Sequence, residues 1–128
     1  MRRMLIVEDE RDLCELLQEF FTSRGFTVLS AFSGEEALSL LQQHTTDVIL
    51  LDILLPGVSG IEVLKRAKDL VPHARIIMVT SLNEEEVRST AFRHGACGYI
   101  TKPFDFSDET WAVAFKPAAP SPPPPAVA

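Results

Sequence analysis

Five side chains suited to metal or phosphate chemistry stand where short apolar runs end. Glu8 and Asp9 follow the first run and Asp52 follows a later one, while Thr80 and Lys102 close two more. Two carboxylates 5 Å apart would repel one another by roughly 3 kcal/mol at an effective dielectric of about 20. A divalent cation with oxygen ligands would offset that repulsion, and Mg²⁺ typically takes one or two carboxylates together with water. The lysine adds a positive charge suited to an incoming phosphate.

The apolar runs are predicted to be the strands that position these side chains. Most are dense in Val, Ile and Leu without polar alternation, which is typical of strands buried on both faces of a parallel sheet. The runs cover residues 4–7, 27–31, 48–51, 76–79 and 98–101. Because functional groups gather at the carboxyl ends of parallel strands, we expect the five side chains to meet at one edge of the sheet.

Helical patterns separate the strands. The clearest has apolar residues at helical spacing and is closed by a glycine; it comprises Leu13, Leu16, Leu17, Phe20, Phe21 and Gly25. Ser33 and Ser59 each precede a glutamate by three residues, as in a capping box. A fifth helix is predicted to start near Asp105 or Ser107 and to run to Lys116, with weak apolar periodicity. Alternating strands and helices predict an α/β fold with helices on both faces of a five-stranded parallel sheet.

Length and composition limit the classes of protein. A chain of 128 residues is about one domain, and its net charge of −6 argues against direct binding to nucleic acid or to an anionic membrane surface. The first residues hold neither a signal peptide nor a membrane span, so we expect a cytoplasmic protein. Six of the nine prolines lie in the last 12 residues. We therefore expect a domain over residues 1–116 and a disordered Pro-rich tail or linker over residues 117–128.

Several motifs of enzymes are missing. No glycine follows the first strand, which excludes the phosphate-binding loops of nucleotide-binding folds. Asp52 lacks the second aspartate two positions later that is familiar from phosphatases with an aspartyl nucleophile. Ser59 and Ser81 have no adjacent histidine for triad chemistry. Cys14 and Cys97 have no CxxC spacing, and we expect both to be buried free thiols.

Four motifs together resemble the receiver domain of two-component response regulators. They are MLIVEDE, DVILLDILLPGVSG, IIMVTS and GYITKPF, in the family's order and at its separations. The resemblance extends from Met4 to about Phe104. It implies a flavodoxin-like, doubly wound sheet with strand order 2-1-3-4-5, the order for which the flavodoxin and chemotaxis-receiver folds are standard examples.

The resemblance also implies roles for single residues. Asp52 is similar to the phosphoacceptor, and Lys102 resembles the lysine that pairs with the phosphoryl group. The Mg²⁺ ligands implied are Glu8, Asp9, Asp52 and the backbone carbonyl of Leu54. The switch residues implied are Thr80 and Tyr99, and the bond between Lys102 and Pro103 is expected to be cis.

The family's function is a phosphorylation-dependent change of a binding surface. The resemblance implies a signalling protein, not an enzyme beyond its own phosphotransfer and dephosphorylation at Asp52. The donor implied is a sensor histidine kinase or a phosphotransfer protein. An output domain, a target protein or a homodimer would receive the signal. The alternative is a scaffold or interaction module that keeps the fold and works without phosphorylation.

The chain departs from the family's pattern after Phe104. The last predicted helix is short, which puts the family's usual dimer face in doubt. Leu54 and Leu82, two positions after Asp52 and Thr80, are apolar and would border the phosphoryl group, so we expect slow hydrolysis. The sequence leaves open whether the chain is a stand-alone receiver or part of a larger regulator or hybrid kinase. It also leaves open whether the tail is a spacer, a disordered end or a ligand for a proline-binding module.

Overall fold

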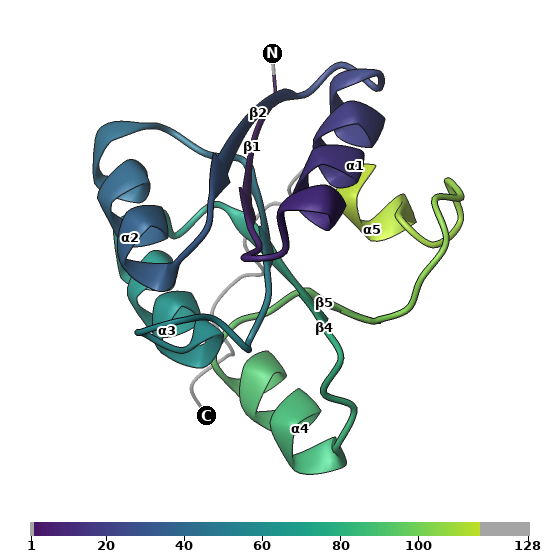
Figure 1. Ribbon diagram of the computed structural model, residues 1–128. Coiled ribbons are helices and arrows are strands. Elements are labelled where there is room, and N and C mark those ends of the chain that lie inside the picture. Colours follow the sequence, from purple (N-terminus) through teal and green to yellow (C-terminus); the bar gives the residue numbers. More distant parts are fainter. Residues whose placement is uncertain (1, 116–128) are drawn as a thin grey trace, which may run out of the picture.

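Five parallel strands form the central sheet of the computed structural model, which describes residues 2–115 (Figure 1). The elements are β1 (Arg3–Val7), α1 (Arg11–Thr22), β2 (Thr27–Ala31), α2 (Gly34–Gln43), β3 (Val48–Leu51), α3 (Gly60–Leu70), β4 (Arg75–Thr80), α4 (Glu85–Arg93), β5 (Gly98–Thr101) and α5 (Ala112–Phe115). The strand order is β2-β1-β3-β4-β5. The predicted fold and strand order are therefore confirmed, and each strand lies within one residue of its predicted limits.

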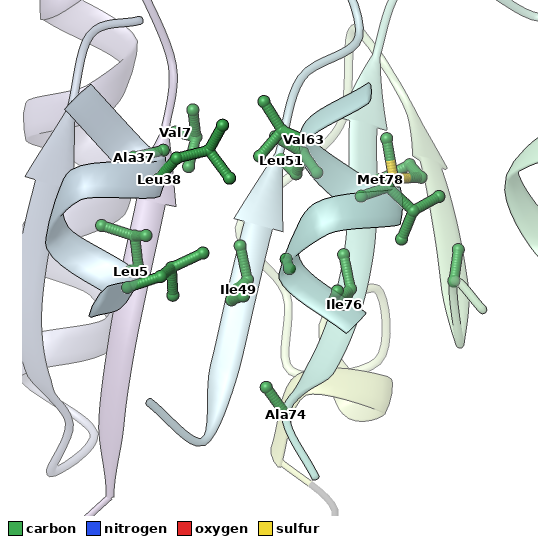
Figure 2. Packing of buried hydrophobic residues seen from close by; sticks show 14 of the residues in the cluster. Leu5, Val7, Ala37, Leu38, Ile49, Leu51, Val63, Ala74, Ile76 and Met78 are labelled. Carbon is green, nitrogen blue, oxygen red and sulfur yellow. The ribbon is translucent and has the colours of Figure 1, made fainter. Parts of the chain in front are cut away.

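Two apolar clusters hold helices against the two faces of the sheet. Residues of α2, α3 and α4 pack on one face, and residues of α1 and α5 pack on the other (Figure 1). On the first face, Leu5, Ile49 and Ile76 of three neighbouring strands lie beneath α2 and α3 (Figure 2). Side chains alternate between the faces along each strand, so the central strands β1, β3 and β4 are buried on both faces, whereas the edge strands β2 and β5 are partly exposed.

The predicted helix caps of α2 and α3 are present. The Ser33 hydroxyl accepts a hydrogen bond from the Glu36 N–H at 3.2 Å, and Ser59 accepts one from the Glu62 N–H at 3.4 Å. These caps satisfy N–H groups that have no partner within a helix. They fix where α2 and α3 start, beside the loops at the carboxyl edge of the sheet.

The last helix begins later than predicted, at Ala112 rather than near Asp105 or Ser107. The Asp105 carboxylate accepts hydrogen bonds from the Ser107 N–H at 3.1 Å and from the Thr110 hydroxyl at 2.6 Å. These hydrogen bonds lower the pKa of Asp105. Side chains that bind nearby backbone groups in this way favour turns over helix. The prediction of a helix from this point was wrong for that reason.

Two arginines hold the end of α5 at the opposite edge of the sheet, where the strands begin. Arg2 donates to the carbonyls of Phe115 at 2.7 Å and Ala114 at 3.2 Å, and Arg75 donates to that of Val113 at 3.2 Å. The last carbonyls of a helix have no partners within it and carry partial negative charge, so guanidinium groups stabilise them. The short helix is thus tied to the starts of β1 and β4.

Cys14 is buried, as predicted, but Cys97 is exposed, so that part of the prediction was wrong. Cys97 directly precedes β5, the edge strand, where one side of the chain has no neighbouring strand. No helix within residues 2–115 is long and apolar enough to cross a membrane. The predicted tail at 117–128 lies outside the described residues, so the boundary at residue 116 stays a prediction.

Candidate functional site

Three carboxylates meet at the carboxyl edge of the sheet and form what we call the acidic pocket: Glu8, Asp9 and Asp52. Glu8 directly follows β1 and Asp52 directly follows β3, and these strands are neighbours. One oxygen from each of the three side chains lies within 4.8 Å of the others. Glu8 and Asp52 are 3% and 5% exposed, whereas Asp9 is exposed. The pocket therefore offers two buried carboxylates and one that is open to solvent.

Lys102 lies against the two buried carboxylates. Its Nζ is 2.6 Å from Glu8 Oε1 and 2.7 Å from Asp52 Oδ2. The lysine directly follows β5, and its peptide bond to Pro103 is cis. One positive charge thus faces two negative charges in a partly buried setting, where ionic hydrogen bonds are stronger than in water.

Burial and pairing shift the protonation of this group of side chains. Burial raises the pKa of Glu8, and the hydrogen bond from Lys102 only partly opposes that effect. Burial alone would lower the pKa of Lys102, but its hydrogen bonds to Asp52 and Glu8 raise it. Lys102 is therefore charged at neutral pH.

The backbone after β3 aims the Asp52 side chain. Asp52 Oδ1 accepts a hydrogen bond from the Leu54 N–H at 3.1 Å, so both carboxylate oxygens have donors. Gly60 N–H donates to the Ile53 carbonyl at 2.9 Å. A Cβ at Gly60 would overlap the backbone of Asp52 and Ile53, so only glycine allows α3 to start this close to the site.

Thr80 and Tyr99 are joined through the backbone of Leu82. Thr80 ends β4 and is fully buried, and its hydroxyl accepts a hydrogen bond from the Leu82 N–H at 3.4 Å. The Tyr99 hydroxyl donates to the Leu82 carbonyl at 2.6 Å. Burial raises the pKa of Tyr99. The two side chains that the sequence suggests as switch residues thus bind opposite sides of one residue.

The structure places the predicted site residues at this edge of the sheet, except that Tyr99 lies within β5 and reaches the edge through Leu82. It also adds contacts that the sequence did not suggest. Leu54 directly flanks the pocket, and its side chain is 54% exposed. The Glu10 N–H donates to Glu8 Oε2 at 3.0 Å, and the Leu82 backbone links Thr80 to Tyr99. The contacts of Glu8 and Thr80 join residues two positions apart. The contact of Tyr99 joins residues 17 positions apart, so no spacing in the sequence could have revealed it.

Comparison with known proteins agrees with this geometry. The response regulator receiver domain family matches residues 4–113. The transcriptional regulatory protein DltR of Streptococcus agalactiae is 37% identical over 110 residues, which are 86% of this chain and 49% of that protein. The chain thus spans about half the length of this relative. Sporulation initiation phosphotransferase F of Bacillus subtilis is 34% identical over 106 residues, which are 83% of this chain and 86% of that protein.

One of the matching solved structures is similar to the chain in both fold and sequence. The crystal structure of a CheX-CheY-BeF3-Mg+2 complex from Borrelia burgdorferi matches with a TM-score of 0.81 and 31% identity, over 90% of each chain. The family consists of signalling proteins and not of classical enzymes. The acidic pocket lies at the edge of the sheet where the motifs of this family end. The chain therefore belongs to the response regulator receiver domains of two-component systems.

Proposed function

We propose that this chain is a phosphorylation-dependent switch in which Asp52 accepts a phosphoryl group from a phosphohistidine. The observation that carries the proposal is the position of the Asp52 carboxylate. It lies between the Lys102 ammonium group and the Leu54 N–H, with two further carboxylates beside it. A nucleophile held on both oxygens in a nearly buried site is oriented before its substrate arrives.

The transfer needs positioning and charge neutralisation more than acid–base chemistry. An Asp52 oxygen attacks the phosphorus atom, the new O–P bond forms as the P–N bond breaks, and the electron pair of that bond returns to the imidazole nitrogen. Lys102 then donates to an oxygen of the phosphoryl group on Asp52, and the Thr80 hydroxyl donates to another. The Lys102 ammonium group already lies beside the Asp52 carboxylate, where negative charge accumulates, which lowers the barrier.

The acidic pocket fits Mg²⁺ by the chemistry of its donors. Its three side chains supply only carboxylate oxygens, the ligands that a hard divalent cation prefers. Glu8, Asp9, Asp52 and the carbonyl of Leu54 would hold the ion. When bound, Mg²⁺ neutralises negative charge shared by the pocket and the phosphoryl group. Solved relatives include a receiver of Thermotoga maritima in complex with Mg(2+)-BeF, which supports this assignment.

The contacts of Leu82 suggest how the signal leaves the site. When the Thr80 hydroxyl turns to the phosphoryl group, it gives up the Leu82 N–H, and the loop before α4 is released from that contact. Leu82 also holds Tyr99 on β5. Phosphorylation therefore favours a different arrangement of the surface formed by α4 and β5, which is a shift between two populations.

The donor is proposed to be a sensor histidine kinase or a phosphotransfer protein that docks beside Asp52. A groove of 460 Å³ opens next to Lys102, with apolar walls from Leu13 and Leu16 of α1 and from Phe104 and Phe106. Leu16 is 50% exposed and Phe106 is 37% exposed. An exposed apolar groove that leads to the acceptor suits an amphipathic helix carrying the phosphohistidine. The signal then passes to an output domain or a separate target, since the DltR relative is about twice as long as the match.

Replacing Leu16 by glutamate tests this docking site. The charge in the groove is expected to lower kcat/KM for transfer from a phosphorylated donor protein about tenfold, because an interface anchor is lost. Phosphorylation by a small phosphodonor should stay unchanged, since the acidic pocket is intact. Transfer rates from both donors measure the difference. Equal losses with both donors would contradict the docking site.

A second prediction concerns the lifetime of the phosphorylated state. Leu54 and Leu82 flank the site and neither side chain can orient a water molecule. We expect the Leu54→Asn variant to hydrolyse the phosphoryl group about tenfold faster than the wild type, because an amide can position the attacking water. The measurement is the decay of radiolabel after the donor is removed. A wild-type half-life of seconds would show that the apolar residues do not protect the bond.

The test of the proposed function is direct. Incubation with Mg²⁺ and acetyl phosphate should add the mass of one phosphoryl group, and peptide mapping after borohydride reduction should place it on Asp52. Chelation of Mg²⁺ should prevent the addition. Modification at another residue, or none at all, would refute the proposal.

A further inference from the structure

The loop between β3 and α3 is hydrogen-bonded to a side chain of α2. The loop covers residues 53–59 and begins beside Asp52. Its ends are joined to each other, because the Gly60 N–H donates to the Ile53 carbonyl at 2.9 Å. Near its C-terminal end the Val58 N–H donates to Glu35 Oε1 at 2.7 Å. Among the described residues, this is the hydrogen bond that ties the loop to an element other than β3 and α3.

Two glycines show how closely α2 and the loop approach. Gly57 has φ +72°, and a Cβ there would come within 2.5 Å and 2.6 Å of the two Glu35 carboxylate oxygens. A Cβ at Gly34, the residue before Glu35, would come within 2.7 Å of the Val58 carbonyl oxygen. The loop backbone therefore lies against the Glu35 side chain at Gly57 and against the backbone of α2 at Gly34. The first turn of α2 and the loop fit as one unit.

We propose that Glu35 is a positioning residue for the metal site. It acts through the loop: Glu35 holds Val58, and at the other end of the same loop lies Leu54, whose carbonyl is a proposed Mg²⁺ ligand. This inference rests on the proposed function, since it concerns the Mg²⁺ that the phosphotransfer uses. Glu35 lies on α2, whereas the residues of the acidic pocket follow β1 and β3. No motif of the sequence singles it out.

The expected size of the effect follows from what the loop lacks. Ile53, Leu55 and Val58 pack against the core, but residues 54, 56, 57 and 59 are exposed, so packing restrains only part of the loop. The hydrogen bond from Val58 is short and its acceptor is charged, which makes it stronger than a neutral one. Without it, binding Mg²⁺ must also order the loop. We expect Mg²⁺ affinity to fall about fivefold, the factor that corresponds to one typical net hydrogen bond.

Three variants separate this role from general effects of charge and stability. Glu35→Ala removes the acceptor, and Glu35→Gln removes the charge but keeps an oxygen that can accept from Val58. Glu36→Ala is the matched control: Glu36 is the next residue, has the same charge and is also exposed, and it accepts a hydrogen bond from the Phe32 N–H at 3.3 Å instead of from the loop. Titration calorimetry with Mg²⁺ on the full chain measures affinity, and thermal unfolding measures stability.

The expected result is a fivefold weaker Kd for Mg²⁺ in Glu35→Ala, with Glu35→Gln and Glu36→Ala within twofold of the wild type. Wild-type affinity in Glu35→Ala would overturn the proposal. Equal losses in Glu35→Ala and Glu36→Ala would also overturn it, because they would show an effect of net charge alone.

A measurement without metal separates this inference from the proposed function. In Mg²⁺-free protein, hydrogen exchange at the Val58 amide should speed up in Glu35→Ala and not in Glu36→Ala. Unchanged exchange would refute the role of Glu35 even if Asp52 is phosphorylated. If instead wild-type Asp52 takes up no phosphoryl group while exchange and Mg²⁺ affinity change as expected, the proposed function fails and the positioning role of Glu35 stands.

Discussion

Replacing Asp52 by asparagine is expected to reduce phosphoryl uptake by more than about a thousandfold, since the nucleophile of the proposed reaction is removed. The amide oxygen of asparagine carries no charge and does not attack phosphorus. Uptake from acetyl phosphate, followed by intact mass, measures the loss.

The fold should survive this substitution. Asparagine keeps an oxygen that can accept from the Leu54 N–H, and Lys102 keeps Glu8 as a charged partner at 2.6 Å. Breaking a buried ion pair is usually costly because it leaves one buried charge without a partner. In this variant the Lys102 charge keeps a partner, so that cost does not arise. Thermal unfolding should show a small change. Asp69→Asn, at an exposed position of α3, is the control for loss of one carboxylate and should take up phosphate at the wild-type rate.

The same variant decides between a switch and a scaffold. If Asp52→Asn is folded and partner binding no longer responds to a phosphodonor, the signal passes through this residue. Binding that is identical in the wild type and in Asp52→Asn, with and without the donor, would instead support an interaction module that works without phosphorylation.

The largest effect on stability is expected at Trp111. Replacing it by alanine should lower the free energy of unfolding by about 3–5 kcal/mol, the usual cost of removing a buried Trp or Phe side chain. Trp111 is fully buried, and its ring lies edge-to-face with Phe21 at 5.3 Å and with Phe104 at 4.9 Å between ring centroids. Its indole N–H also donates to the Asp105 carbonyl at 2.9 Å. The substitution thus leaves a cavity and an acceptor without its donor.

Phe106→Ala is the matched control for Trp111→Ala. Phe106 is an aromatic residue of the same segment but is 37% exposed, so its removal should cost much less. Urea unfolding followed by circular dichroism suits both variants, since fluorescence would lose its tryptophan. A loss below 1 kcal/mol in Trp111→Ala would show that the last segment is not part of the core.

Much of the fold could be predicted because its central strands β1, β3 and β4 are buried on both faces. Such strands appear as uninterrupted apolar runs, and β3 (Val48–Leu51) is fully apolar and fully buried. The helix starts at Ser33 and Ser59 were predictable because caps use local contacts between residues three apart. The acidic pocket followed from topology, since parallel strands end at one edge of the sheet.

The last segment could not be predicted in the same way. Its apolar residues have no helical period, yet Trp111 is buried because Phe21 of α1, which is distant in the sequence, packs against it together with Phe104. Local turn chemistry at Asp105 delays the helix, and Arg2, directly before β1, and Arg75 of β4 bind its last carbonyls. Cys97 lies at the rim of the edge strand, and its neighbours in sequence do not show that.

The sequence alone determined the class of fold, the strands and the residues that form the acidic pocket, because these depend on residue type and on order along the chain. Only the tertiary structure decided how those residues are held. The Leu82 backbone joins Thr80 to Tyr99, and Glu35 reaches Val58 from another helix. Backbone groups are the same in every residue and distant contacts have no spacing in the sequence, so these links exist only once the chain is folded.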